Sequence, residues 1–113
     1  MIPRKKLLPL RKNFRRFRKE GRRFDSPTFG MTLLFGKEEN EQVAFVVSKK
    51  VSPSSVVRHQ VKRRFAAAVE RFLPRVSRTA KMVFFPKAGA GEATTEAVAA
   101  EMEALLKRIR LLS

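Results

Sequence analysis

Hydrophobic residues along the chain form two patterns. Short continuous runs predict strands, and residues that recur every three to four positions predict helices. Runs of β-branched, aromatic and other apolar residues occupy residues 28–35, 42–48 and 81–85, which predicts three strands. The second run is apolar almost throughout, as in a strand that is covered on both faces. A glycine and a polar stretch after residue 35 mark a turn. A further short strand fits between residues 24 and 28.

Two longer segments have the spacing of three to four residues that marks one face of a helix. The middle helix begins after Pro53-Ser54-Ser55, which is a helix-start signal, and Pro74 stops it. The last helix begins at about Thr95. We expect the apolar stripes of both helices to face the core. The stripes are Val57, Val61, Phe65, Ala68 and Phe72 in the middle helix, and Val98, Met102, Leu105, Ile109 and Leu112 in the last helix.

A short, strongly basic helix is predicted ahead of the strands. Asn13 belongs to the residue types that cap helix starts, the helix runs from residue 14 to about residue 20, and Gly21 stands where helices commonly end. The length fits a single domain over residues 1–113, with residues 1–12 as a flexible basic leader. The element order is α-β-β(-β)-α-β-α. We therefore expect an α+β two-layer sandwich, with helices packed on a small sheet.

The net charge narrows the class of function. Lysine and arginine number 26 against 10 acidic residues, a formal charge of +16, so the folded chain repels itself unless a polyanion neutralises it. A nucleic acid is the expected partner. The absence of cysteine excludes disulfides and thiolate metal sites, and we expect a cytoplasmic protein. No apolar run approaches the roughly 18 residues that span a bilayer, so we expect no membrane partner.

The basic residues fall into two blocks. The first block has eleven lysines and arginines within residues 1–23, opposed only by Glu20. The second block lies in a stretch from residue 42 to residue 69 that has no acidic residue. Fixed spacing on a strand end and a helix would allow such residues to match phosphate positions. The second block consists of Lys49, Lys50, Arg58, Lys62, Arg63 and Arg64.

The middle helix arranges its basic residues beside the apolar stripe. Arg58 and Lys62 lie on one line along the helix. His59 and Arg63 form a second line further round. Arginine can bind a phosphate with two donors and stack on bases, whereas lysine acts as a point charge. This side of the helix is a candidate RNA-binding face; the alternatives are a solvated basic face and, for the two strand-end lysines, protection of a sheet edge.

Ten phenylalanines must supply both the core and any base stacking, because tryptophan and tyrosine are absent. Most of them must belong to the core. Phe14 and Phe17 lie about one turn apart in the basic first helix, next to Arg18. Stacking of a base on Phe14 or Phe17 competes with packing of the same ring against the sheet.

The chain has no recognisable catalytic set. Hydrolysis of a phosphodiester by protein groups needs carboxylates that hold metal ions, or a histidine that acts as acid or base. Asp25 is the one aspartate, the glutamates fall in polar turns and on the last helix, and His59 has no companion for a metal site. We expect no catalytic residue and no cofactor or metal bound by the protein itself.

One stretch of the sequence carries a family resemblance. The residues VAFVVSKKVSPSSVVRHQVKRRF, from 43 to 65, resemble the central segment of the bacterial ribonuclease P protein. In that family an apolar strand is followed by Ser-Lys-Lys, a short loop and a helix that opens with Arg-Asn-Arg-x-Lys-Arg. LRKNFRRFRKEGRRFDSPTF resembles the family's first helix and following strand, and KMVFFPKAGA its strand and loop before the last helix. The resemblance covers most of the chain.

The resemblance implies a ribosomal-protein-like fold with a left-handed crossover through the middle helix. It also implies two partners, the catalytic RNA of ribonuclease P and precursor tRNA, and no protein partner. The protein would be the non-catalytic subunit of an endoribonuclease that matures tRNA 5′ ends, with the chemistry done by Mg²⁺ ions that the RNA requires. By position, the residues facing the catalytic RNA are Lys49, Lys50, Arg58, His59, Gln60, Lys62 and Arg63, and those of a leader-binding cleft are Phe14, Phe17 and Arg18.

Some positions depart from the family pattern. His59 and Gln60 replace the asparagine and the second arginine of the helix motif, and both can still donate hydrogen bonds. Ala66 and Ala67 stand where the family has Arg-Glu, and Phe17 lies one position before the usual aromatic. A ribosomal or ribosome-assembly protein is an alternative with the same charge. A membrane-active cationic protein is another, for which only the middle helix has the amphipathic character.

Overall fold

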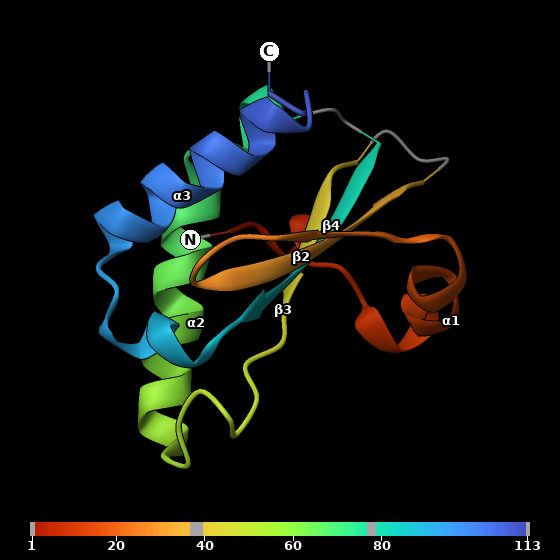
Figure 1. The fold of residues 1–113 in the computed structure, drawn as a ribbon. Helices are drawn as coiled ribbons and strands as arrows, with labels where there is room; N and C mark the ends of the chain where they lie inside the picture. Colours follow the sequence, from red (N-terminus) through yellow and green to blue (C-terminus); the bar gives the residue numbers. More distant parts are fainter. Residues whose placement is uncertain (1, 37–39, 77–78, 113) are drawn as a thin grey trace.

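The computed structural model of the protein describes residues 2–36, 40–76 and 79–112. Its elements are α1 (Leu10–Glu20), β1 (Arg22–Asp25), β2 (Phe29–Phe35), β3 (Gln42–Phe45), α2 (Ser55–Glu70), β4 (Ala80–Pro86) and α3 (Thr95–Arg108), with short 3-10 helices at Arg4–Lys6, Leu73–Arg75 and Ala88–Glu92 (Figure 1). The predicted order of elements is confirmed. The additional strand exists, and it lies slightly earlier than predicted.

The strands form one sheet in the order β1-β2-β4-β3. β1 pairs with β2, and β2 with β4, in antiparallel fashion, whereas β3 and β4 are parallel. Parallel neighbours need a crossover connection, and the chain makes it through α2. The α+β class and the crossover through the middle helix are therefore as expected. β1 and β3 are the two edges of the sheet.

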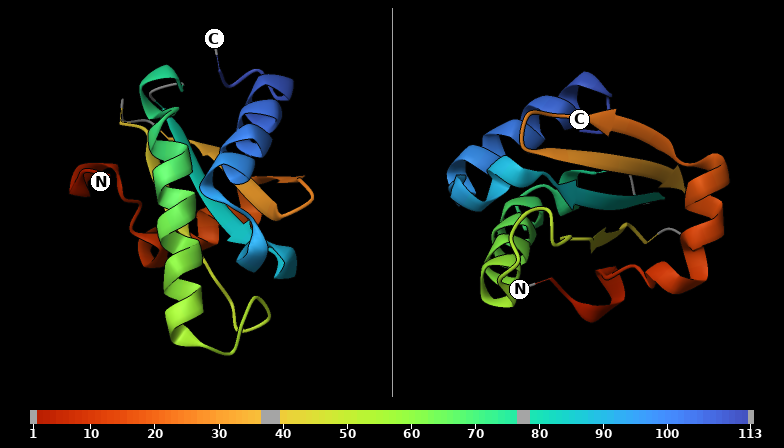
Figure 2. Two further views of the ribbon diagram at one scale, coloured as in Figure 1. Left: turned by 90° about the vertical axis from the view of Figure 1, so that its left-hand side faces the viewer. Right: turned by 60° about the horizontal axis from the view of Figure 1, so that its bottom comes forward.

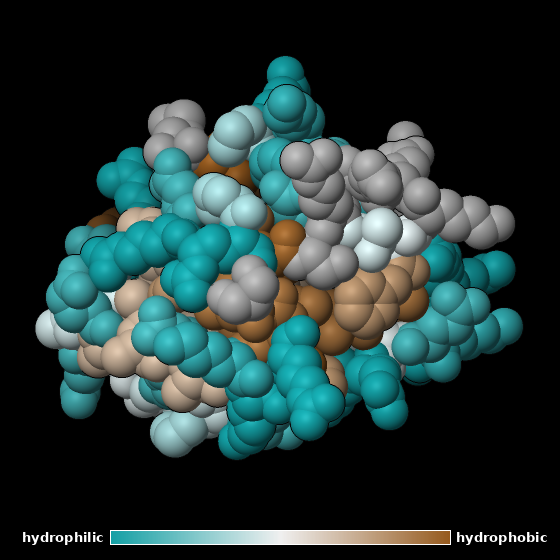
Figure 3. All heavy atoms as spheres, turned by 90° about the horizontal axis from the view of Figure 1, so that it is seen from above, coloured by the Kyte–Doolittle hydropathy of each residue, from teal (hydrophilic) through white to brown (hydrophobic). Residues whose placement is uncertain are grey.

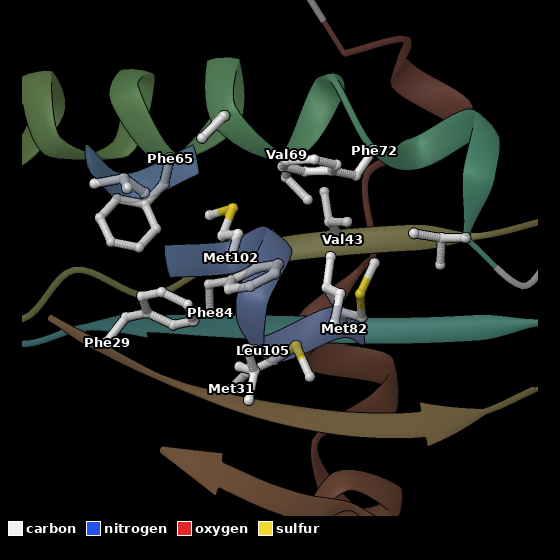
Figure 4. Packing of buried hydrophobic residues seen from close by; sticks show 14 of the residues in the cluster. Phe29, Met31, Val43, Phe65, Val69, Phe72, Met82, Phe84, Met102 and Leu105 are labelled. Carbon is white, nitrogen blue, oxygen red and sulfur yellow. The ribbon is translucent and has the colours of Figure 1, made fainter. Parts of the chain in front are cut away.

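The main core lies between one face of the sheet and the pair α2 and α3, which run side by side across it (Figure 2). Phe65 of α2 is fully buried, and its ring meets Phe29 of β2 edge-on at 5.6 Å between centroids. Figure 4 shows this packing around Phe84 and Met102. The two predicted stripes are buried as expected, except that Val57 and Ile109 are only partly buried.

α1 packs on the opposite face of the sheet and covers one end of it (Figure 1). Phe17 joins Leu8, Leu34 and Val83 there in a second, smaller buried cluster. The sheet thus has helices on both faces, where we expected two layers. Because a single short helix covers the second face, part of that face stays open.

The start of α1 differs from the prediction. The helix begins at Leu10, directly after Pro9, and Asn13 lies inside it. We expected a flexible leader over residues 1–12, but Arg4–Lys6 forms a 3-10 turn, and the Leu8 N–H donates to the Val43 carbonyl oxygen at 2.8 Å. Ile2 and Leu8 are buried. This segment therefore runs along the β3 edge before α1 begins.

The end of β3 also differs. The strand ends at Phe45 and not at residue 48, although the Val46 N–H still donates to the Phe84 carbonyl oxygen at 2.9 Å. Lys49 and Lys50 consequently lie in a turn after the strand. They do not extend the rigid strand as the sequence suggested.

Gly21 ends α1, as predicted, but its role is close packing. Its φ of −67° is open to any residue. A Cβ at this position would lie 2.5 Å from the Phe17 carbonyl oxygen and 2.5 Å from Thr32 Cγ2. The missing side chain therefore allows the end of α1 to lie close against Thr32 of β2.

A carboxylate of α3 holds the turn between β1 and β2. Glu101 accepts hydrogen bonds from the Ser26 hydroxyl at 2.6 Å, the Thr28 N–H at 2.7 Å and the Thr28 hydroxyl at 2.7 Å. Burial disfavours the charged form of Glu101, but the hydrogen bonds from Ser26 and Thr28 outweigh it and lower its pKa. The ionised carboxylate thus ties the hairpin to the last helix.

The Glu101 contact predicts a loss of stability in acid. A group whose pKa is lower in the folded state stabilises the fold above its unfolded pKa, and this stabilisation is lost as the pH falls through the folded pKa. The melting temperature should therefore fall as the pH drops below the ordinary glutamate value of 4.5. Glu101→Gln should melt lower at neutral pH and respond less to acid, as measured by calorimetry.

Glu103→Gln is the matched control, because Glu103 makes only an exposed pair with Lys107 at 3.5 Å, which is worth little. This variant should follow the wild-type melting curve at every pH. Identical acid dependence of Glu101→Gln and wild type would show that Glu101 does not carry the effect.

Candidate nucleic-acid interface

The open part of the sheet and α1 together form a groove of about 410 Å³. Its floor comes from the sheet face opposite α2 and α3, and α1 forms one wall. We call it the α1 groove. Its lining residues are Phe14, Phe17, Arg18, Gly21, Arg23, Thr32, Val46, Val83 and Phe85. All three residues predicted for a leader-binding cleft line this groove.

The two predicted aromatic residues of the groove differ in burial. Phe17 is buried in the small cluster under α1, so its ring holds the helix on the sheet. Phe14 is 52% exposed, so its ring is available to a ligand. Phe17 thus packs against the sheet, and Phe14 is the candidate for stacking on a base.

Two arginine–phenylalanine pairs line the α1 groove. The guanidinium carbon of Arg18 lies 5.6 Å from the centroid of the Phe14 ring, and that of Arg23 lies 5.0 Å from the centroid of Phe85. Both distances are within the range of cation–π contacts. Arginine and phenylalanine faces also stack on nucleobases. The groove therefore combines an apolar floor with two pairs in which an arginine guanidinium lies over a phenylalanine ring.

Gly30 of β2 makes room for the second pair. A Cβ at this position would lie 2.2 Å from Nη2 of Arg23. Gly30 pairs with Asp25 on one side and with Phe85 on the other. The gap left by the missing side chain therefore allows the Arg23 guanidinium to lie across β2 and reach the Phe85 ring.

The second block of basic residues lies on and before α2, on the other side of the sheet. We use the name α2 surface for the residues of this block other than Arg64, together with the neighbouring His59 and Gln60. Within the described ranges none of its members forms an ion pair. Arg58 is half-buried and the others are exposed. The members are Lys49, Lys50, Arg58, His59, Gln60, Lys62 and Arg63.

Two arginines of α2 have structural partners. Arg58 Nη1 donates to the carbonyl oxygens of Ser52 at 3.0 Å and Pro53 at 2.9 Å, which fixes the loop before α2. Arg64 Nη1 donates to the Gly91 carbonyl oxygen at 2.9 Å. Arg64 therefore holds the loop after β4. Arg58 is itself part of the α2 surface, and it also holds the loop that precedes α2.

The α1 groove and the α2 surface lie back to back at the end of β3. Successive side chains along a strand point to opposite faces. Val46 lines the α1 groove, whereas Phe45 and Val47 line a shallow depression beside Arg58 and Lys62. One short stretch of chain therefore supplies floor to both surfaces.

Sequence reasoning did not assign six of the nine lining residues to the groove. Alternation within the predicted strand 81–85 sets Val83 and Phe85 against the core-facing Met82 and Phe84, and this signal could have marked the strand's second face. Nothing local marked the others, because their place depends on the pairing of strands. The residues that sequence reasoning did not assign to the groove are Gly21, Arg23, Thr32, Val46, Val83 and Phe85.

The described part of the chain shows neither a cluster of metal-ligating side chains nor a membrane-spanning helix. No group of three or more histidine or acidic side chains there is placed to hold a metal ion. None of the helices in residues 2–36, 40–76 and 79–112 has the length and apolar character of a membrane span.

Figure 3 shows the side of the molecule on which the C-terminus lies, where hydrophilic residues surround a hydrophobic centre.

The protein is thus a small α+β domain that carries cationic side chains on both faces of its sheet. The sequence profile of the Ribonuclease P family matches residues 2–110. The chain therefore belongs to the ribonuclease P protein family, as its resemblance in sequence suggested.

A curated relative in sequence is also a ribonuclease P protein. The ribonuclease P protein component of Chloroflexus aurantiacus is 39% identical over 71 residues, which are 63% of this chain. The match spans about half of that relative, 52% of its length.

Solved structures share the fold at low identity. The RNase P protein of Staphylococcus aureus superposes with a TM-score of 0.83 at 18% identity, covering 96% of this chain and 98% of that one. The RNase P protein of Thermotoga maritima gives 0.80 at 21% identity, covering 90% of this chain and 96% of that one.

Proposed function

We propose that this protein is the protein subunit of ribonuclease P and acts in the cytoplasm. The α2 surface binds the catalytic RNA, and the α1 groove binds the 5′ leader of precursor tRNA. Hydrolysis is carried out by Mg²⁺ ions that the RNA holds. The observation that supports this proposal most directly is the α1 groove with its two arginine–phenylalanine pairs, in a chain of the ribonuclease P family.

The α1 groove suits a single strand better than a duplex. Bases in a duplex are stacked inside it, whereas an unpaired leader can lay bases against Phe14 and Phe85 and phosphates against Arg18 and Arg23. Stacking of this kind tolerates any base, because every base has a π-face. The proposed contact therefore accepts leaders of differing sequence.

The α2 surface suits an RNA of fixed shape. Its cations are carried by a helix and by a loop that Arg58 holds in place. Such groups match a particular set of phosphates. With a net charge of +16, the protein reduces the repulsion between the catalytic RNA and its substrate when it lies between them.

Reconstitution tests the proposed function. Purified protein is added to the catalytic RNA of the same genome at low Mg²⁺, and cleavage of precursor tRNA is followed. We expect cleavage at Mg²⁺ concentrations at which the RNA alone is slow. Equal rates with and without protein would contradict the proposal. Co-purification with ribosomal RNA in place of the catalytic RNA would point to a ribosomal role.

Phe14→Ala tests the α1 groove. Removal of an exposed stacking ring should weaken binding of leader-bearing precursor tRNA by roughly fivefold or more, and it should leave binding of mature tRNA unchanged. The measurement is affinity for the two substrates in the reconstituted holoenzyme. Phe35→Ala is the control, because Phe35 is equally exposed and lies outside the groove. Equal loss for both substrates would exclude a leader contact at Phe14.

A further inference from the structure

A second, shallower depression lies on the α2 side of the β3 edge. It has a volume of about 290 Å³, and it is lined by Phe45, Val47, Ser55, Arg58, His59 and Lys62. An adjoining hollow of about 230 Å³ continues along the edge past Leu7 and Val43, and it shares Phe45 and Lys62 with the first. An aromatic ring thus lies at the surface among cations of the α2 surface.

The Phe45 ring is held firmly in place. It stacks on Phe84 with 5.9 Å between centroids and 19° between ring planes. Phe84 in turn meets Phe29 edge-on at 5.7 Å in the core. Phe45 is only partly buried and lies at the outer end of this row of rings. A further flat ring placed in the depression would extend the row.

Phosphate binding alone does not require this arrangement. Exposed cations on a polar helix face suffice to bind phosphates. A depression with an apolar floor and a cationic rim instead complements a group that is flat and apolar on its faces, polar at its edge and attached to a phosphate. An unpaired nucleotide has this chemistry, because its base is not enclosed in a stack.

We propose that the α2 surface contains a base-binding subsite, in which one unpaired nucleotide of the catalytic RNA inserts its base between Phe45 and the side chains of Arg58 and His59. Lys62 binds the attached phosphate. The subsite rests on the proposed function and deepens it, because it adds to the phosphate contacts a contact that only an unpaired nucleotide can make. The catalytic RNA is thereby recognised by its fold, at a bulge or loop.

Fluorescence provides a direct test, because the chain has no tryptophan or tyrosine. Phe45→Trp introduces a single indole into the subsite, and Ala104→Trp introduces one at an exposed position of α3. A base stacked on the indole quenches its emission. Addition of saturating catalytic RNA should quench the emission of the Phe45→Trp variant and leave that of the Ala104→Trp variant nearly unchanged. Unquenched emission from the Phe45→Trp variant in the bound complex would overturn the subsite.

Phe45→Leu gives a second, independent measurement. Leucine keeps an apolar side chain but cannot stack, so affinity for the catalytic RNA should fall roughly five- to a hundredfold. The dependence of affinity on salt should not change, because no charge is removed. Circular dichroism and urea unfolding establish that the variant is folded. Wild-type affinity in folded Phe45→Leu would overturn the subsite.

The two proposals fail in different ways. Suppose that wild-type protein binds the catalytic RNA and stimulates cleavage, while the Phe45→Trp variant is unquenched and Phe45→Leu binds normally. The subsite is then wrong and the proposed function is untouched. If wild-type protein neither binds this RNA nor stimulates cleavage, the proposed function itself is wrong, and the subsite falls with it.

Discussion

The double substitution Lys62→Ala/Arg63→Ala is expected to weaken binding of the catalytic RNA by roughly tenfold for each lost charged contact. The slope of log affinity against log salt should shrink by about two units, because two fewer phosphates are neutralised. Both side chains are exposed and form no ion pair within the described ranges. The loss should therefore appear in binding, as measured by filter binding over a range of salt, and not in stability.

Arg75→Ala/Lys107→Ala is the matched control, because it removes the same charge from exposed positions outside the α2 surface. Its salt slope should stay close to that of wild type. Equal slopes for the two double variants would mean that net charge alone drives binding. Arg58 is not used in this test, because its bonds to Ser52 and Pro53 would mix a structural loss with a loss of contact.

Phe65→Ala is expected to lower the free energy of unfolding by about 3–5 kcal/mol. The side chain is fully buried between α2 and the sheet, and it loses its edge-on contact with Phe29. Domains of this size are stable by only about 5–15 kcal/mol. The variant should therefore unfold at much lower urea concentration, as followed by circular dichroism.

Phe14→Ala is the matched control for Phe65→Ala, since it removes the same ring from an exposed position. Its urea midpoint should stay close to that of wild type. The two substitutions thus separate the phenylalanines that build the core from those offered to a ligand. A Phe65→Ala midpoint equal to that of Phe14→Ala would contradict the packing described above.

The two long helices were predictable because their signals are local. The Ser54 hydroxyl accepts a hydrogen bond from the Val57 N–H at 3.4 Å, and the Thr94 hydroxyl accepts one from the Ala97 N–H at 3.1 Å. Each cap stands one residue before the helix it starts. Capping residues followed by apolar residues at helical spacing fix both the start and the buried face of such helices.

The start of α1 and the end of β3 were not predictable in the same way. Leu7 and Leu8 are held by pairing with Val43, which is distant in sequence. β3 ends where its ladder with β4 ends, and not where its apolar residues end. Tertiary partners decide both boundaries, and local propensity does not report them.

The candidate site was predictable by residue type more than by geometry. Sequence reasoning placed Phe14, Phe17 and Arg18 together, and they do line one groove. It could not assign Phe17 to the buried side, or bring Arg23 against Phe85, because both depend on how strands pair and where α1 lies. Those placements follow from the sheet register, which the local pattern of residues does not reveal.

The alternation of side chains at the end of β3 imposes a shared constraint on both surfaces. Phe45 and Val46 are neighbours in the chain but belong to opposite faces. An insertion or deletion of one residue here would shift the strand by half its repeat and exchange the two faces. Side chains that now line the α1 groove would then face the α2 surface, and those that line the α2 surface would face the groove. This stretch can therefore vary in composition, one face at a time, but not in length.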